Sequence, residues 1–265
     1  MAKETKFNID TNKMMEAGAH LGHQISKLHP KMKDYIFGVR NTIHIIDLEK
    51  TAVQLEKVLE FIKELIKKGG ILLLIETKPP LRDLVKEIAD DCGIPYVNER
   101  WLGGTFTNFK IILERIKWFR ELERRKKEGE LEKYTKKERV QFDKELKNLE
   151  IKFGGIKNLE KIPEAVFICD VKRNILAIKE AKTKGVKVIA IADTNVDPNL
   201  ADYPICANDG AVSSVRYILE KVKKVILDSK TEPPPLKEGA KVKKSAKSSL
   251  PVKTQSAKPK LKTQT

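Results

Sequence analysis

The residues of this sequence that come nearest to catalytic chemistry are two aspartates behind a short apolar run. Asp193 and Asp197 follow residues 186–192, and Pro198 comes directly after the second aspartate. Two carboxylates at the end of a strand could bind Mg²⁺ or act as general acid and base. They could equally cap turns, which is the usual place of an Asp before a Pro. We favour turns, with a divalent ion at Asp193 as the alternative.

A second candidate site lies near the N-terminus, where histidines and basic residues gather. His20 and His23 are three positions apart and could form half of a zinc site, but the sequence offers no third ligand that can be named. Contact with phosphate or with backbone from a glycine-rich turn is the role we favour. Lys31, Lys33 and Arg40 follow among aromatic residues, a mixture that suits contacts to an RNA backbone. We expect these five residues to line one RNA-facing surface, and we expect no cofactor.

A third candidate is segment 100–109, which combines two adjacent glycines with hydroxyl residues just before a predicted helix. Backbone N–H groups at such a helix start could meet a phosphate. Trp101 could stack on a base, although we favour its burial between a helical hairpin and a sheet. We expect Arg100, Thr107 and Asn108 to contact RNA.

The signatures of common enzyme sites are missing from the sequence. The apolar run 71–75 is followed by Glu-Thr-Lys-Pro-Pro, which has no glycine and cannot form a phosphate-binding loop. There is no serine nucleophile elbow, and no cysteine has a histidine near it in sequence. Cys92, Cys169 and Cys206 are far apart and odd in number, so we interpret each as a small core residue in a reducing cytosol. We therefore predict that the protein is not an enzyme.

The charge balance indicates a polyanionic partner. The 265 residues carry 53 Lys and Arg against 37 Asp and Glu, a formal net charge of +16. Segment 231–265 holds nine Lys and two Glu, which leaves +9 (16 − 7) on residues 1–230. Such an excess favours nucleic acid or an anionic membrane surface. No apolar run approaches the roughly 20 residues of a spanning helix, and the N-terminus has no secretory leader, so we predict nucleic acid and no membrane.

Alternating strand and helix signals predict the fold. Helices are expected at 48–68, after Pro79-Pro80, at 174–184 and at 210–227. Strands are expected at 71–75, 95–97, 165–169 and 186–192, and the first of these is apolar on both faces, as a buried parallel strand must be. This order predicts an α/β domain of the doubly wound, flavodoxin-like type, with a parallel sheet and helices on both faces.

One stretch interrupts the alternation and predicts a coiled-coil helical hairpin. Residues 105–127 and 135–153 carry narrow apolar seams, and Thr135-Lys136-Lys137-Glu138 fits a capping box. With 15 basic against ten acidic residues from 110 to 152, we favour an arm for RNA or a protein partner over a merely solvated coiled coil. The predicted organisation is an α/β domain from 1–104 and 154–230, a protruding antiparallel hairpin at 105–153, and a disordered Lys-rich tail at 231–265.

Three groups of short motifs run in order along residues 8–227. They are AGAHLGHQ from 17, PKMK from 30, YIFG from 35 and IHIIDL from 43; YVNERWLGG from 96 with TN at 107; and GGIK from 154, DTN from 193, DP at 197, YPI from 203 and ND at 208. Together they resemble the signatures of the S-two family of bacterial small ribosomal subunit proteins, which is related to the eukaryotic ribosomal protein SA.

The resemblance implies a parallel-sheet fold with a protruding hairpin and assembly onto 16S ribosomal RNA. It implies small-subunit ribosomal proteins as partners, docking of the large S-one protein during translation, and a cytoplasmic, ribosome-associated location. The runner-up is an enzyme that binds a phosphorylated ligand near Asp193, since doubly wound sheets host many activities. A third hypothesis is that the protein is a coiled-coil adaptor whose hairpin binds only protein.

Overall fold

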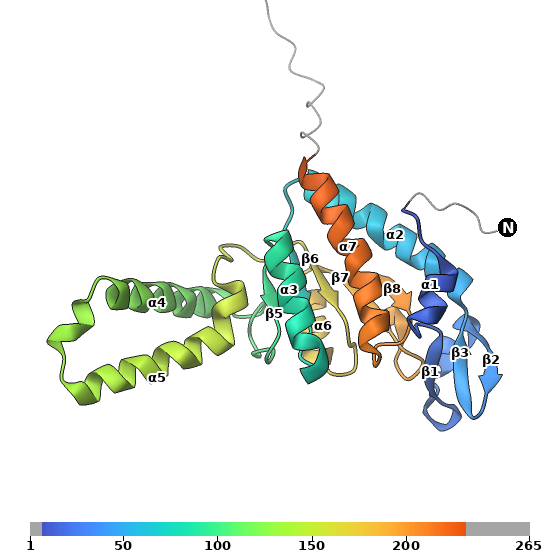
Figure 1. The fold of residues 1–265 in the computed structure, drawn as a ribbon, viewed down its shortest axis with the longest axis horizontal. Helices are drawn as coiled ribbons and strands as arrows, with labels where there is room; N and C mark the ends of the chain where they lie inside the picture. Colours follow the sequence, from blue (N-terminus) through green and yellow to red (C-terminus); the bar gives the residue numbers. More distant parts are fainter. Residues whose placement is uncertain (1–6, 232–265) are drawn as a thin grey trace, which may run out of the picture. The chain divides into compact units, whose positions relative to one another are not determined.

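A five-stranded parallel sheet forms the centre of the computed structural model, which describes residues 7–231 (Figure 1). The strand order is β5-β4-β6-β7-β8, and each neighbouring pair is parallel. The strands are β4 (Leu72–Ile75), β5 (Tyr96–Val97), β6 (Ala165–Ile168), β7 (Lys187–Ala192) and β8 (Tyr203–Cys206). The predicted α/β class with a parallel sheet is confirmed.

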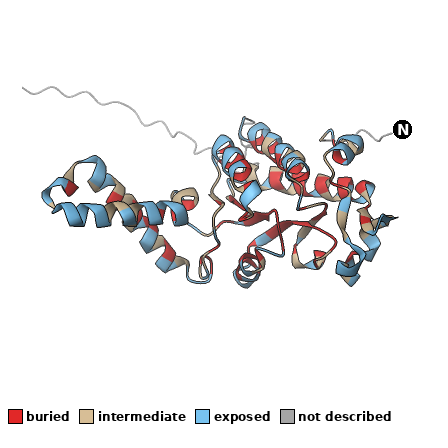
Figure 2. Cartoon of the chain, turned by 60° about the horizontal axis from the view of Figure 1, so that its bottom comes forward, coloured by how far each residue is buried: buried red, intermediate tan, exposed pale blue. Residues whose placement is uncertain are grey.

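Helices cover both faces of the sheet, as predicted, because alternate strand residues point to opposite sides. Leu72 and Leu74 of β4 belong to one buried cluster, whereas Leu73 and Ile75 belong to another. The first cluster includes α2 (Leu48–Lys67), α3 (Arg82–Cys92) and α7 (Val212–Thr231), and the second includes α6 (Ile175–Thr183). Figure 2 shows the buried sheet between these helical layers.

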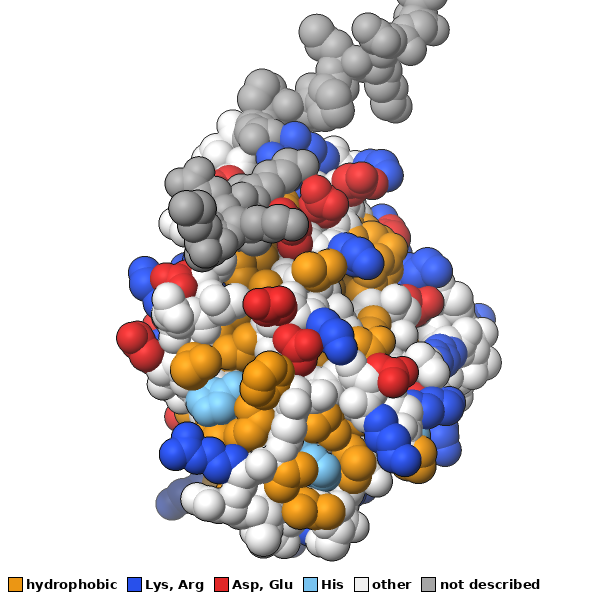
Figure 3. Space-filling view, turned by 90° about the vertical axis from the view of Figure 1, so that its right-hand side faces the viewer, with side chains coloured by type: hydrophobic (Ala, Val, Ile, Leu, Met, Phe, Trp, Pro, Cys, Tyr) orange, Lys and Arg blue, Asp and Glu red, His pale blue; other side chains and the backbone are white. Residues whose placement is uncertain are grey.

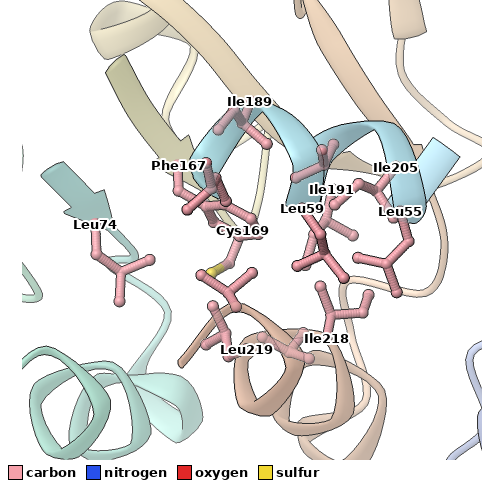
Figure 4. Close-up of a cluster of buried hydrophobic side chains, with 14 of the residues drawn as sticks. Leu55, Leu59, Leu74, Phe167, Cys169, Ile189, Ile191, Ile205, Ile218 and Leu219 are labelled. Carbon is pink, nitrogen blue, oxygen red and sulfur yellow. The ribbon is translucent and has the colours of Figure 1, made fainter. Parts of the chain in front are cut away.

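The first cluster holds together helices that are far apart in the sequence. Leu55 and Leu59 of α2 and Ile218 and Leu219 of α7 pack with sheet residues such as Phe167 (Figure 4). All five side chains are fully buried. Burial of one such side chain contributes roughly 1.5–3 kcal/mol, so packing against the sheet is sufficient to fix both helices.

Strand β8 was not predicted, because Pro204 stands within it. The strand lies at the edge of the sheet, where a proline is tolerated. Side chains of α2 cover its open edge. Gln54 Oε1 accepts a hydrogen bond from Cys206 N (2.8 Å), and the Thr51 hydroxyl donates to Cys206 O (2.6 Å). These bonds satisfy backbone groups that would otherwise be open to pairing with another chain.

A second sheet, near the N-terminus, was also not predicted. It follows α1 (Thr11–Glu16) and is antiparallel, with the order β1-β3-β2, and we call it the β1–β3 sheet. Its strands are β1 (Leu21–Gln24), β2 (Ile36–Arg40) and β3 (Ile43–Ile46). Asn41 and Thr42 join β2 to β3 with φ angles of 47° and 64°, as a tight hairpin turn requires. The strands escaped prediction because they are short and their apolar residues do not alternate cleanly.

The predicted helical hairpin is present as α4 (Phe109–Lys127) and α5 (Lys136–Phe153), which leave the sheet side by side (Figure 1). Thr135 and Glu138 form the predicted capping box at the start of α5. Across the pair, the Trp118 indole donates to Glu145 (2.9 Å). The apolar side chains between α4 and α5 continue into the core of the sheet, because Phe119 of α4 and Phe153 of α5 belong to the second buried cluster.

The predicted tail lies outside the described residues, apart from Thr231 at the end of α7. Its disorder therefore stays a prediction. Within residues 7–231, no helix has both the length and the apolar character needed to cross a membrane.

Gly155 gives a test of the packing between the hairpin and the sheet. It lies in the short turn after α5, two residues beyond Phe153, and a Cβ atom there would overlap the backbone oxygen and ring of Tyr96 in β5. We expect Gly155→Ala to lower the free energy of unfolding by about 1–3 kcal/mol, the usual cost of overpacking, in urea denaturation. Gly38→Ala is the control, because a Cβ at Gly38 has no atom within 4 Å. Equal losses in the two variants would contradict the packing argument.

Candidate nucleic-acid interface

His23 connects the β1–β3 sheet to the end of β7. Its Nδ1 lies 3.1 Å from Asp193 Oδ2, and its Nε2 lies 3.1 Å from Asn195 Nδ2. Its backbone N–H donates to the Thr194 hydroxyl (2.9 Å). Gly22 approaches so closely that a Cβ there would stand 2.5 Å from Thr194 Cγ2. The imidazole that we expected to contact RNA therefore has both nitrogens beside protein atoms.

His20 is half-buried just before β1. Its backbone oxygen accepts a hydrogen bond from Ile46 N of β3 (2.8 Å), and its Nδ1 is buried without a hydrogen-bond partner among the described residues. In the part of the chain that the structure describes, no group of three or more His, Cys, Asp or Glu is arranged to hold a metal ion. The described residues therefore offer no set of metal ligands at His20 and His23, where zinc was considered, and none at Asp193, where a divalent ion was considered.

Lys31 and Asp197 form an ion pair that joins the N-terminal segment to the loop after β7. Lys31 Nζ lies 2.7 Å from Asp197 Oδ2, with the side chains 54% and 21% exposed. Hydrogen bonding to Lys31 lowers the pKa of the Asp197 carboxyl. Asp197 also accepts a hydrogen bond from Asn199 N (2.9 Å), so the turn-capping role expected for this aspartate is confirmed. Lys31 is thus partly neutralised within the chain.

Lys33 and Arg40 differ from Lys31, because both are exposed and neither side chain has a partner within residues 7–231. Apolar side chains are exposed in the same region, with Phe37 at 81%, Ile25 at 50% and Leu21 at 41%. Figure 3 views this end of the molecule and shows hydrophobic side chains at the surface, with Lys and Arg beside them. The region around the β1–β3 sheet therefore offers both unpaired cations and uncovered apolar groups.

The loop before α4 was expected to offer backbone N–H groups to a phosphate, and in the structure Glu180 of α6 accepts them. The N–H of Gly104 donates to Oε1 (2.8 Å), and those of Phe106 and Thr107 donate to Oε2 (2.9 and 3.3 Å). Trp101 is buried, as favoured from the sequence, and its indole also donates to Glu180 (3.4 Å). Because these residues form a loop, α4 begins four residues later than predicted, at 109 instead of 105.

Arg100, Thr107 and Asn108 lie in the segment between β5, an edge strand of the sheet, and α4, and all three are exposed. Thr107 is bonded to Glu180 through its N–H and its hydroxyl (3.4 Å), whereas the side chains of the other two have no partner within residues 7–231. The opposite edge is β8, whose Cys206 packs with Ile46 of the β1–β3 sheet. The two groups of predicted RNA contacts are therefore on opposite edges of the sheet and do not form one site.

The carboxyl ends of the parallel strands, where such sheets usually bind ligands, are occupied by side chains that bind one another. Lys78 follows β4 and lies 3.8 Å from Asp170, after β6, and 3.5 Å from Asp209, after β8. Glu76 is fully buried, and one of its carboxyl oxygens has no partner among the described residues. Burial raises the pKa of Glu76 to about 7 and that of Asp209 to about 6. Glu76 was not predicted as a site residue, because the segment after residues 71–75 was examined for a phosphate-binding loop and not for a buried carboxylate; its place directly after an apolar run was the signal.

The raised pKa of Glu76 gives a pH-dependent test. An acid with a folded pKa of about 7 and an ordinary value of 4.5 binds more protons in the folded state. Stability is therefore lost as the pH rises from about 4.5 to about 7. Glu76→Gln is uncharged throughout, so urea unfolding should find it more stable than the unchanged protein at about pH 8, by on the order of 3 kcal/mol, and nearly equal at about pH 4.5. A variant with the same pH dependence as the parent would contradict this assignment.

Comparison with known proteins finds relatives over most of the chain. The family model described as ribosomal protein S2 matches residues 14–229. The small ribosomal subunit protein uS2 of Dictyoglomus thermophilum is 46% identical over 223 residues, which are 84% of this chain and 91% of that protein. The protein of the same name from Dictyoglomus turgidum is 45% identical over the same length and the same shares. The matched residues include the parallel sheet, the β1–β3 sheet and the hairpin. The chain therefore belongs to the ribosomal protein S2 family, whose members are structural proteins and not enzymes.

Proposed function

We propose that this chain is a structural constituent of the small ribosomal subunit, in which it binds 16S ribosomal RNA and other small-subunit proteins in the cytoplasm. Family membership over residues 14–229 is the observation on which the proposal rests. The formal charge of +9 on residues 1–230 supports it, because a basic protein is attracted to RNA phosphates. The runner-up enzyme is disfavoured, since Lys78, Asp170 and Asp209 occupy the strand ends where a substrate would bind.

The principal RNA contacts that we propose are Lys33 and Arg40. Both are exposed, and neither side chain has a partner within the described chain, so each can approach a phosphate without first breaking an ion pair. Lys31 contributes less, because Asp197 neutralises part of its charge. The contacts of His20 to β3 and of His23 to the loop after β7 support a positioning role for both beside this surface.

A second RNA contact is proposed at the β5 edge, through Arg100, Asn108 and Thr107. The first two side chains are exposed without partners in residues 7–231. Thr107 is exposed, but its hydroxyl is bonded to Glu180, so we propose that it holds the loop in place for the other two contacts. Two contact regions on opposite edges of the sheet would hold the protein in one orientation on a folded RNA, since phosphate contacts fix position and orientation.

The exposed apolar side chains near the β1–β3 sheet are the site that we propose for docking the S-one protein. In the β2–β3 ladder Ile36 pairs with Ile46 and Gly38 with Ile45, so Phe37 is the extra residue of a β-bulge. A bulge redirects a side chain, and Phe37 is 81% exposed. Exposed aromatic and aliphatic groups of this kind are typical of protein contacts, and RNA phosphates would gain little from them.

The RNA proposal is tested by the double variant Lys33→Ala and Arg40→Ala. We expect weaker binding to 16S ribosomal RNA in filter-binding titrations, and a salt dependence (log K against log salt) that is less steep by roughly one to two units. The melting temperature should stay nearly unchanged, because exposed charges contribute little to folding.

Lys68→Ala is the control for this experiment, since Lys68 is an exposed lysine after α2. It should alter the salt dependence less than the double variant does. A salt response that is flat from the start, or equal for the control and the double variant, would rule out Lys33 and Arg40 as phosphate contacts.

The docking proposal is tested by Phe37→Ala, which removes the most exposed apolar side chain. We expect binding of the purified S-one protein to weaken by about tenfold or more, as for an aromatic anchor, while the affinity for RNA remains. Val140→Ala, at a residue of α5 that is 47% exposed, is the control. Unchanged S-one binding by Phe37→Ala would place the docking site elsewhere.

A further inference from the structure

Glu180 is a buried carboxylate that joins α6 to the loop leading into the hairpin. It is 6% exposed. Its oxygens accept hydrogen bonds from the backbone N–H groups of Gly104, Phe106 and Thr107, from the Thr107 hydroxyl and from the Trp101 indole. We call these five residues the Glu180 cluster. Glu180 is separated from the other four residues by 73 to 79 positions in the sequence, so the cluster is a tertiary connection and not part of a local turn.

The carboxylate binds the loop immediately before α4. Asn108 is the N-cap residue of α4, but its side chain makes no capping hydrogen bond. Two of the N–H donors to Glu180, those of Phe106 and Thr107, lie just before this helix start. Burial raises the pKa of Glu180, but the hydrogen bonds from Phe106, Gly104 and Thr107 outweigh it and leave the pKa lowered, so the group stays ionised.

The loop around Glu180 is itself compact. Phe106 is fully buried, and its ring meets that of Trp101 edge-on at 4.9 Å. The Thr105 hydroxyl donates to Leu102 O (2.6 Å). Gly104 has a φ of +92°, a conformation that favours glycine. A loop with this much internal packing moves as one piece, so holding it at Glu180 also holds the start of α4.

We propose that Glu180 is a positioning residue that fixes the direction in which the hairpin of α4 and α5 leaves the sheet. The contacts inside the hairpin, such as Trp118 with Glu145, hold its two helices to each other and not to the sheet. At its base the hairpin packs on the sheet through Phe119 and Phe153, and Glu180 adds the hydrogen-bonded connection between the loop before α4 and α6. The proposal goes beyond the proposed function, because it concerns how the hairpin is held and not what it binds.

The experiment measures the hairpin's placement in the full-length protein. Spin labels at Val53→Cys on α2 and Val140→Cys on α5, both exposed positions, report the distance between the helical layer and the hairpin. The three native cysteines are buried, so the labels attach at the two new sites. We expect a narrow distance distribution in the parent and a clearly broader one in Glu180→Gln, in which an amide N–H group would face the N–H donors of the loop.

Amide hydrogen exchange checks that the change begins in the Glu180 cluster. The amides of residues 104, 106 and 107 should exchange about tenfold faster or more in Glu180→Gln, since losing a charged acceptor of buried N–H groups costs at least this factor. Glu145→Gln is the matched control. It makes the same chemical change at another acceptor of a tryptophan indole, but inside the hairpin, and it should leave both the distance distribution and these amides unchanged.

Rescue by a small carboxylate gives a further test, because added formate would not restore the hairpin's placement if Glu180 only filled space. Glu180→Ala leaves an anion-sized space among the N–H donors, so formate should narrow the distance distribution again in this variant. Chloride at the same ionic strength should not. Formate should have no effect on Glu180→Gln, where the space is filled.

Three results would overturn the proposal. The first is a spin-label distance distribution in Glu180→Gln that is as narrow as in the parent. Even if the loop amides exchange faster, Glu180 would then order only the loop and not the hairpin. Another is broadening of the same size in Glu145→Gln. If Glu180→Ala does not fold, Glu180→Asp decides in its place: it keeps the charge but reaches less far, and a distribution identical to the parent's would equally contradict the assigned role.

Discussion

A parallel sheet whose central strands β4 and β6 are apolar at every position must be covered on both faces, and most of this structure follows from that requirement. All four residues of β4 and of β6 are buried. One face is covered by the long helices α2 and α7 together with α3. The other face has α6, a helix of nine residues, and the base of the hairpin completes that layer through Ile116, Phe119 and Phe153. The hairpin is therefore part of the core at its base, where Glu180 of α6 also binds the loop before α4.

The sequence predicted the parts of the fold in which local pattern and tertiary environment agree. Strands β4, β6 and β7 were found because a strand covered on both faces is a continuous apolar run, and the start of α5 was found because Thr135 and Glu138 form its cap within four residues. Strand β8 was missed because its proline is acceptable only at an edge, and no local signal says which strand is the edge. The β1–β3 sheet was missed because its strands are short, and it is held by contacts such as that of His23 with Asp193, far along the chain.

The same distinction explains the candidate site. Residue types and spacing located the segments with Lys31, Lys33 and Arg40 correctly as basic and largely exposed. They could not say that Asp197 pairs with Lys31 and leaves the other two without partners, because that pairing joins positions 166 residues apart. The loop at 101–107 shows more clearly which part of a site the sequence can predict. Its N–H groups do form an anion site, as the sequence indicated, but the anion is Glu180 of the chain itself.

The structure shows that part of the positive charge of the hairpin is neutralised by pairing within the chain. Arg124 and Arg125 both bind Glu121, whose pKa the hydrogen bonds from these arginines lower to about 2. Lys126 pairs with Asp143 of the facing helix at 2.7 Å. Exposed pairs of this kind add little to stability, but each leaves almost no net charge for a phosphate. Lys33 and Arg40 have no such partners in the described chain. The hairpin pairs neutralise the α4 arginines near the turn of the hairpin, whereas other cations on it, such as Lys117, Lys136 and Arg139, are exposed and form no ion pair within residues 7–231. We therefore expect the hairpin to keep part of its attraction for polyanions, in addition to that of the β1–β3 sheet.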